Sequence, residues 1–411
     1  MPDQTIVLEW LTFATRWLHV IVAIAWIGSS FYFIALDLGL RKTKNLPNKA
    51  KGEEWQVHGG GFYHITKYMV APKTLPEHLI WFKWESYATW LSGFTMLILV
   101  YYLGNSYFLV DENVLEMPKW SAILISLFSL SLGWLIYDLL CKSPIGKSQN
   151  GLMVVLFGVL VVIAWAYAQV FTGRAALLHL GALTATIMSA NVFFIIIPNQ
   201  KIVVKDLKAG RTPAAHLGAQ AKQRSLHNNY LTLPVIFLML SVHYPLAFAT
   251  EFNWLIASII FLIGVLIRHY FNTKHARLGK LNWTWFLAAI LFGIIIWLSA
   301  IGKPTSDNFE NATNEQLPFF QNVNFSEVNE TIIARCSMCH TAEPAYEGVN
   351  RPPKNIILDN EIAIAKYAKQ ITLQAGFSTA MPPGNISYME DSERALIVKW
   401  YQESIKAGRK L

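Results

Sequence analysis

The chain has 411 residues, of which 54% are hydrophobic and 15% are charged. This composition lies outside the usual range of soluble proteins and predicts a protein embedded largely in a membrane. The formal net charge of +8 does not indicate a nucleic-acid partner, because the basic excess lies in the apolar part of the chain. From Lys303 onward there are 11 basic and 13 acidic residues.

Eight apolar runs are long enough to cross a bilayer, which takes about 20 helical residues. They are, approximately, 11–36, 79–103, 120–140, 151–171, 175–197, 229–249, 254–270 and 283–301. The first run lacks the basic leader and cleavage site of a signal peptide, so we expect it to remain as a helix. The sequence predicts an all-α fold that begins with a polytopic bundle of about eight transmembrane helices over residues 1–302.

Loop charge predicts the orientation of these helices. Eighteen Lys and Arg residues lie in the four loops on one side, whereas the N-terminus and the remaining loops carry two; the four loops are 37–78, 141–150, 198–228 and 271–282. Basic loops stay in the cytoplasm. We therefore expect a multi-pass protein surrounded by the lipid of a bacterial inner membrane, with both termini periplasmic.

The first loop contains an unusual polar segment from Trp55 to Tyr68. It holds His58 and His64 on either side of three glycines, and Lys67 follows. Glycines let a backbone approach a ligand closely, and imidazoles can exchange protons near neutral pH. A flexible surface loop with incidental histidines is the alternative.

Two further polar segments border apolar spans. His78, Lys83 and Glu85 lie at the start of the second span, where charges are costly and indicate function by default. Snorkelling of Lys83 to the interface is the simpler explanation. The run His227, Asn228 and Asn229 opens the sixth span and could hydrogen-bond a flat ligand or cap a helix.

Three histidines fall in the periplasmic halves of their predicted spans: His19, His179 and His243. A pair of imidazoles there could ligate a haem b, although a single intramembrane histidine is more often hydrogen-bonded within the bundle.

The C-terminal part has a different composition. Residues 303–326 are polar and predict a flexible tether, followed by a small all-α domain over 327–411. This domain contains Cys336-Ser337-Met338-Cys339-His340, the Cys-x-x-Cys-His pattern of covalent haem c attachment. Cys336 and Cys339 would bind the porphyrin, His340 would ligate the iron, and Met381 is expected as its second axial ligand.

A zinc site or a redox dithiol is the alternative for these cysteines, but the domain has no further Cys or His to complete a zinc site. The helices expected at 330–336 and 391–404 resemble the first and last helices of a class I cytochrome c. One covalent haem c is therefore predicted.

Several long strings resemble the membrane-bound urate oxidases, or urate hydroxylases, which join an eight-helix membrane domain to a C-terminal cytochrome c. The resemblance lies in residues 16–19, 25–33, 58–63, 81–93, 133–138 and 227–234. It implies oxidation of urate to 5-hydroxyisourate, with oxygen from water, and the expected substrate is urate or a related purine. Electrons would pass through haem c to a downstream cytochrome c or terminal oxidase.

For this chemistry we interpret His58 or His64 as the base, and Lys83 or Lys67 as the cation that holds the urate anion. Glu85 and His78 would accompany them, and His227, Asn228 and Asn229 would orient the purine. A site at the cytoplasmic loops would lie across a ~30 Å hydrocarbon core from a periplasmic haem c. Either a haem b relays electrons or the purine binds more deeply.

Two other functions are compatible with the same predicted helices. One is a quinol-oxidising electron-transfer protein, and the other is a transport domain with a fused cytochrome as redox sensor.

Overall fold

The computed structural model describes residues 4–48, 50–69, 72, 75–104, 108–111, 114–301, 315–347, 349 and 352–408. The chain is predominantly helical and divides into two compact units. The first comprises Met1–Val242 with Leu246–Pro304, and the second comprises His243–Pro245 with Thr305–Leu411.

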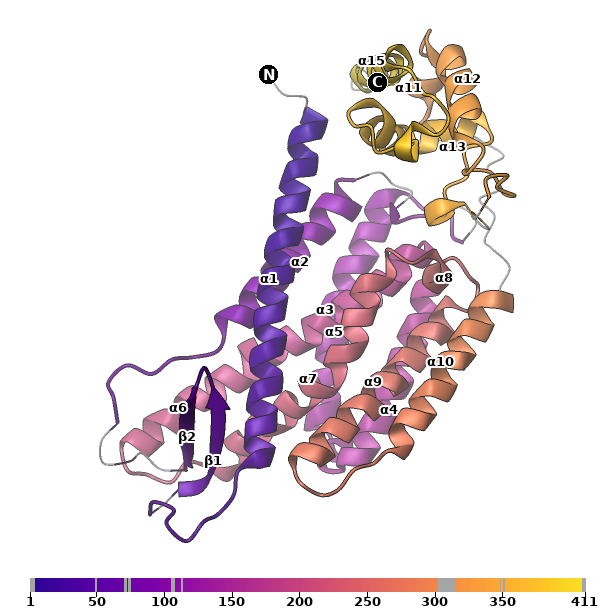
Figure 1. Ribbon diagram of the computed structural model, residues 1–411. Helices are drawn as coiled ribbons and strands as arrows, with labels where there is room; N and C mark the ends of the chain where they lie inside the picture. Colours follow the sequence, from indigo (N-terminus) through magenta and orange to yellow (C-terminus); the bar gives the residue numbers. More distant parts are fainter. Residues whose placement is uncertain are drawn as a thin grey trace. The chain divides into compact units, whose positions relative to one another are not determined.

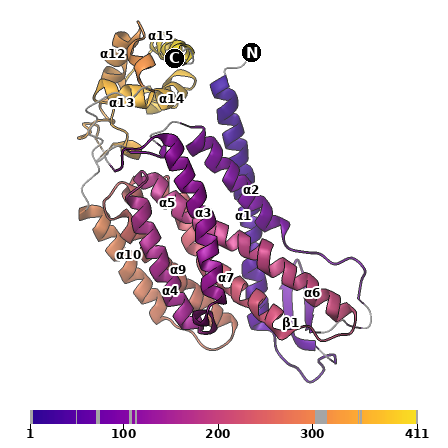
Figure 2. The same ribbon diagram turned by 180° about the vertical axis from the view of Figure 1, so that it is seen from behind.

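The first unit is a bundle of helices (Figures 1 and 2). These are α1 (Gln4–Gly39), α2 (Trp84–Leu97), α3 (Lys119–Lys142), α4 (Gln149–Ala168), α5 (Gly173–Ala190), α6 (Ile197–Lys208), α7 (Ala215–Ser241), α8 (Pro245–Phe248), α9 (Asn253–His275) and α10 (Trp283–Ile301). π-helical turns extend α2 over Ile98–Tyr102 and join α5 to α6 over Asn191–Ile196. Each of the eight predicted runs overlaps one of these helices.

Within the described residues, six helices are long and apolar enough to cross a membrane: 6–39, 119–142, 149–168, 173–208, 253–275 and 283–300. Length and composition therefore do not support the predicted count of eight. The two helices outside the six are α2 and α7. α2 has only 14 residues and carries Glu85 in its first turn, and a run of polar residues lowers the mean hydropathy of α7.

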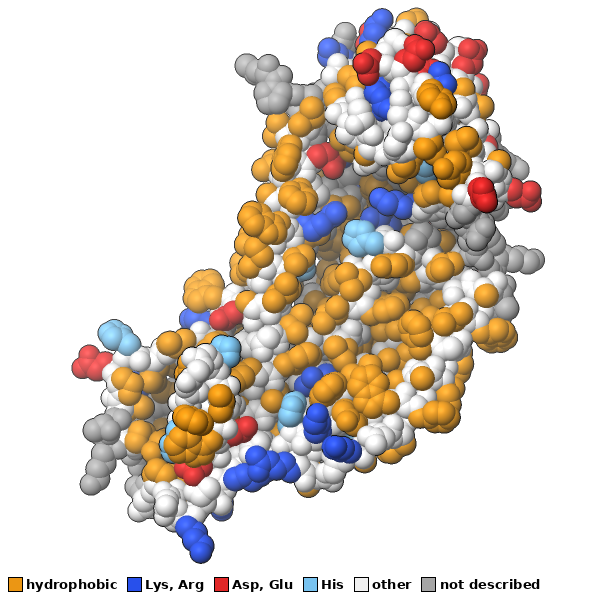
Figure 3. All heavy atoms as spheres, viewed as in Figure 1, with side chains coloured by type: hydrophobic (Ala, Val, Ile, Leu, Met, Phe, Trp, Pro, Cys, Tyr) orange, Lys and Arg blue, Asp and Glu red, His pale blue; other side chains and the backbone are white. Residues whose placement is uncertain are grey.

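α5 is the most buried long helix and packs against α3, α4 and α7. α9 lies between α7, α4 and α10, while α1 packs along α2 and α9. Large apolar side chains remain exposed on the outside of the bundle, as Figure 3 shows along its flank. Such an apolar exterior is compatible with a multi-pass membrane protein.

A β-hairpin follows α1, so the all-α prediction is wrong for this segment. β1 (Ala50–His58) pairs antiparallel with β2 (Gly61–Tyr68), with Trp55 opposite His64. The two residues of the turn, Gly59 and Gly60, have φ values of 60° and 78°. Two successive residues with positive φ form the tight turn that matches the twist of a hairpin, and glycine adopts it without strain.

The second unit contains α11 (Leu317–Phe320), α12 (Phe325–Cys336), α13 (Glu361–Lys366), α14 (Ala368–Ile371) and α15 (Asp391–Gly408). Short turns at Pro353–Asn355, Thr372–Gly376 and Pro383–Asn385 complete it. Residues 303–314 of the predicted tether lie outside the described residues. From Glu315 the tether prediction is wrong, because the apolar Phe319 and Phe325 are buried in this unit's core.

Candidate functional site

The hairpin holds predicted site residues on an exposed surface. His58, at the end of β1, is exposed. The ring of His64 stacks on Trp55 with centroids 4.2 Å apart, and its Nε2 lies 2.8 Å from Glu53 Oε2. Hydrogen bonds from Thr43 and then from His64 hold the pKa of the Glu53 carboxyl below its ordinary value. The contacts of His64 thus stabilise the hairpin itself.

The other predicted site residues between β2 and the first turn of α2 are also dispersed. Lys67 forms an ion pair with Asp37 at 2.5 Å, and His78 is exposed. Lys83 is half-buried just before α2, with Nζ 5.7 Å from the neighbouring indole ring. Glu85 has a buried Oε2 without a hydrogen-bond partner in the described part of the chain. No hydrogen bond or ion pair between described residues joins these four predicted side chains to one another.

In contrast, His227 and Asn228 of α7 lie in a buried polar cluster. The Tyr137 hydroxyl is 2.7 Å from His227 Nδ1. Asn191 Nδ2 donates to Tyr137 Oη at 3.0 Å and to Asn228 Oδ1 at 3.1 Å, while Asn228 Nδ2 donates to the Met188 carbonyl at 2.9 Å. We name this group the α3–α7 cluster; its members are Tyr137, Asp138, Asn191, Arg224, His227 and Asn228.

The charges of the α3–α7 cluster are paired. Arg224, only 3% exposed, donates from Nη2 to Asp138 Oδ1 at 2.7 Å. The other carboxylate oxygen of Asp138 lies 2.6 Å from Lys142 Nζ. The Arg224 guanidinium also lies 4.9 Å from the centre of the Tyr137 ring. A buried charge requires such a partner, and these contacts fix the tyrosine that holds His227.

A cavity of about 210 Å³ adjoins the cluster near the C-terminal end of α3. Its walls include Arg224 and two further basic residues, Lys142 and Lys147, with Gln220 and Gln223 from α7. A cavity with this lining suits a small anion electrostatically.

Asn229 belongs to a second cluster, because successive residues on a helix point about 100° apart. It is fully buried, and its Oδ1 accepts from Asn272 Nδ2 at 2.9 Å and from Arg268 Nε at 3.4 Å. Arg268 also donates to Asn272 Oδ1 at 3.2 Å. Its guanidinium lies 3.8 Å from the centre of the Phe31 ring. We name Phe31, Asn229, Arg268 and Asn272 the α9 cluster.

The three histidines considered as haem b ligands occupy different settings. His19 Nδ1 lies 3.1 Å from the Thr89 carbonyl and 3.0 Å from Ser92 Oγ. Both nitrogens of the buried His179 are engaged, at 2.7 Å from the Ala175 carbonyl and 2.7 Å from Ser126 Oγ. Iron ligation by His179 would break one of these bonds. His243 lies in the turn after α7, and a second haem stays a prediction.

In the second unit, Cys336 ends α12 and Cys339 and His340 follow within one turn. Both cysteines are free thiols, as covalent attachment to a porphyrin would require. His340 Nδ1 lies 2.9 Å from the Ile356 carbonyl. This contact leaves the lone pair of Nε2 to bind a metal. Met381 packs against the unit's core. The donor set of two thiols, one imidazole and one thioether fits a haem c, and these residues would hold it.

The N-terminal region matches a known family. A family model described as urate oxidase N-terminal covers residues 5–299. The chain belongs to this family. No curated protein and no solved structure matches the chain. The matched region contains both the α3–α7 cluster and the α9 cluster, so the urate oxidase family assignment applies to the segment in which the buried polar residues gather.

Sequence reasoning missed several members of these clusters. Asp138 and Arg268 lie inside predicted apolar spans, where an ionisable residue indicates a functional site by default; that signal was sufficient to find them. Asn191 and Arg224 carry no comparable local signal. Their importance depends on which helices pack together.

Proposed function

We propose that this protein is a membrane-bound urate hydroxylase. It converts urate to 5-hydroxyisourate with oxygen from water and passes the electrons through a haem c of its own second unit to the respiratory chain. The family match over residues 5–299 carries this proposal. The two buried polar clusters support it, because a planar heteroatom-rich anion needs hydrogen-bonding and cationic groups inside an otherwise apolar bundle.

The reaction adds water at C5 of urate and releases two protons and two electrons. A base must take a proton from that water. We assign this role to His227 in the tautomer whose Nδ1–H donates to the Tyr137 hydroxyl oxygen, because Nε2 then carries the lone pair that accepts the proton. The Asn228 amide, already bonded to Asn191 and to the Met188 carbonyl, holds the cluster together, and the exposed His58 and His64 have no assigned role.

In the second unit, Cys336 and Cys339 would attach the haem, and His340 and Met381 would ligate its iron. A bound haem would supply a one-electron carrier whose potential is raised by methionine ligation. The hydrogen bond between His340 and the Ile356 carbonyl fixes the ring orientation for this role.

We further propose eight membrane-crossing helices, with α2 and α7 completing the six apolar ones. The burial of the polar residues of α7 supports this proposal, since Arg224, His227, Asn228 and Asn229 are at most 5% exposed and avoid lipid. The charge difference between loops supports a location of both termini in the periplasm of a bacterial inner membrane.

The proposal is tested by anaerobic addition of urate to the purified, oxidised protein while the visible haem spectrum is recorded. Prompt reduction, with ¹⁸O from labelled water in 5-hydroxyisourate, is the expected result. Absence of reduction by urate, together with ready reduction by a quinol, would overturn the proposal and favour a quinol-oxidising electron carrier.

Two variants separate the candidate bases. His227→Asn should lower the rate of urate-driven reduction about 10²- to 10⁴-fold, the usual contribution of a general base. His58→Ala, on the exposed hairpin, should retain the rate within about twofold. Equal losses in both variants, at equal haem content, would reject the assignment of His227.

A further inference from the structure

In the first unit, Arg268 is a buried guanidinium without a carboxylate partner among the described residues. It is 5% exposed in the middle of α9, and no Asp or Glu of the described residues lies within ion-pair distance of it. Arg224, which is equally buried, has Asp138 at 2.7 Å. A positive charge in an apolar bundle is costly unless an anion accompanies it. The uncompensated charge of Arg268 therefore indicates a missing anionic partner.

Three buried polar atoms of α7, the end of α9 and the hairpin also lack hydrogen-bond partners among the described residues. They are Asn229 Nδ2, His275 Nδ1 and Glu54 Oε2. The orientation of the Asn229 amide follows from its contacts, since Oδ1 already accepts from two N–H donors. Its free N–H group therefore offers a donor, while Glu54 offers an acceptor. Each unsatisfied buried group of this kind requires an explanation, and a bound ligand supplies one here.

These atoms extend along one side of α9. Arg268, Asn272 and His275 are spaced by four and three residues, which places them on one face over about 10 Å. On α1, Phe31 contacts Arg268, and eight residues later the Glu54 carboxylate lies against Gly39.

Contacts at the end of α9 place Glu54 near His275. Arg41 of the segment that leads into the hairpin donates to the Ala276 carbonyl at 3.1 Å. The charges of both Arg268 and Glu54 also act on His275. Cation, amide donor and acceptors thus follow one line between α1, α7 and α9.

We propose that this line of residues binds the purine as a planar anion, with Arg268 as its anchor. The inference rests on the proposed function and specifies where the purine is first held, on the side of α7 that faces α9, whereas His227 lies on the side that faces α3. The guanidinium pairs with the delocalised negative charge, Asn229 Nδ2 donates to a ring carbonyl, and Glu54 Oε2 accepts a ring N–H. Phe31 holds the guanidinium plane by stacking, so that its N–H edge is presented to the ligand.

The test measures equilibrium binding of radiolabelled urate to the full-length, haem-loaded protein in detergent, and the urate concentration for half-maximal haem reduction. Arg268→Gln should raise both the dissociation constant and the half-maximal urate concentration by about 10- to 100-fold, because a charge-assisted bidentate contact is lost. Arg268→Lys should recover only part of the loss. Lys274→Gln is the matched control, since it removes an exposed charge from the same end of α9 and should change both by less than about twofold.

The outcomes distinguish this inference from the proposed function. If the unmodified protein neither binds urate nor is reduced by it, the function itself is wrong. If the unmodified protein is active and Arg268→Gln binds urate normally, the anchor is wrong. Should Arg268→Gln fail to insert, Phe31→Leu and Asn229→Ala retain the guanidinium and are expected to weaken binding at least about threefold; normal binding by both would also overturn the inference.

Discussion

Asp138 is the carboxylate that neutralises the α3–α7 cluster. Its two oxygens bind Arg224, which is buried, and Lys142, whose side chain is 57% exposed. The same acid therefore takes part in one interaction shielded from water and in one accessible to it. The two ion pairs should differ greatly in their contribution to the free energy of unfolding, because removing one member of a buried pair leaves an uncompensated charge.

We predict that Asp138→Asn lowers the free energy of unfolding by about 3–5 kcal/mol. Lys142→Gln should lower it by less than about 1 kcal/mol. Unfolding of both variants in mixed detergent micelles, followed by circular dichroism, measures the difference. Equal destabilisation by the two substitutions would show that the buried pair has no special role.

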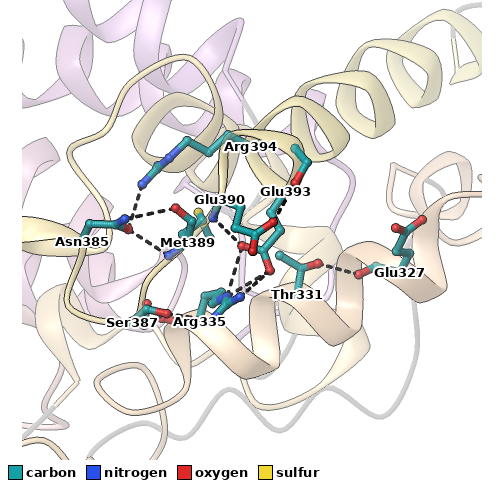
Figure 4. Close-up of polar contacts among 10 residues, drawn as sticks. Glu327, Thr331, Arg335, Asn385, Ser387, Met389, Glu390, Glu393 and Arg394 are labelled. Atoms are coloured by element: carbon teal, nitrogen blue, oxygen red, sulfur yellow. Dashed lines mark hydrogen bonds and ion pairs between the residues drawn. The ribbon is translucent and has the colours of Figure 1, made fainter.

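Glu393 connects the first and last long helices of the second unit (Figure 4). Arg335 Nε lies 3.0 and 3.1 Å from its two oxygens, and the Glu390 backbone N–H donates to it at 2.7 Å. Burial raises the pKa of this carboxyl, but the hydrogen bonds from Arg335 and the Glu390 amide outweigh burial and hold the pKa below its ordinary value.

This lowered pKa predicts acid sensitivity of the second unit. The ionised Glu393 contributes its stability above the unfolded pKa of about 4.3, and this contribution is lost as the pH falls through the lower folded pKa. Glu393→Gln should flatten the acid side of the curve of thermal midpoint against pH. Glu343→Gln, at an exposed position, should leave the curve unchanged, and identical curves for all three proteins would contradict the prediction.

At the scale of elements, α7 and α9 cross where a proline of one meets a glycine of the other. A Cβ placed on Gly264 would lie 2.5 Å from Cδ and 2.6 Å from Cγ of Pro234. Because the proline ring is fixed to its own backbone, it cannot rotate away. Close helix contact in membranes commonly depends on such small residues.

Gly264→Ala should therefore separate the two helices and lower the free energy of unfolding by about 1–3 kcal/mol. Gly158→Ala in α4 is the control, since nothing lies within 4 Å of a Cβ there. That substitution should be neutral or stabilise the helix by up to about 1 kcal/mol. A stability of Gly264→Ala equal to that of Gly158→Ala would contradict the close packing.

Sequence patterns located the helices because an apolar run of about 20 residues has few stable structures other than a membrane-spanning or buried helix. They did not reveal the hairpin, whose strands are short and mostly polar, although the consecutive Gly59 and Gly60 were a turn signal. They found His227, Asn228 and Asn229 but grouped them with His58 and His64. The polar clusters require Tyr137, Asn191 and Arg268 from three other helices, and only tertiary packing determines that combination.

At the scale of the whole molecule, the distribution of charge predicts how the chain crosses the membrane. Basic side chains gather toward the end of the first unit that carries the hairpin (Figure 3). An even number of crossings then returns the chain to the side from which it began.

A cysteine-labelling experiment checks this topology in a Cys141→Ser background. A membrane-impermeant maleimide should label Glu361→Cys in intact spheroplasts, because the second unit is expected in the periplasm. It should label Lys280→Cys, in the exposed loop after α9, only after the membrane is permeabilised. Labelling of Lys280→Cys in intact cells would reverse the orientation.

The π-helical turn between α5 and α6 has an evolutionary consequence. A π turn is the geometry that one inserted residue leaves inside an α-helix. Asn191, which bonds both Tyr137 and Asn228, begins this turn. Because the wider π turn absorbs the extra residue, a relative lacking one residue between 191 and 196 would continue α5 into α6 as a regular α-helix without the bulge that Asn191 begins. Chain length in this short segment is therefore a marker for tracing when the buried cluster arose.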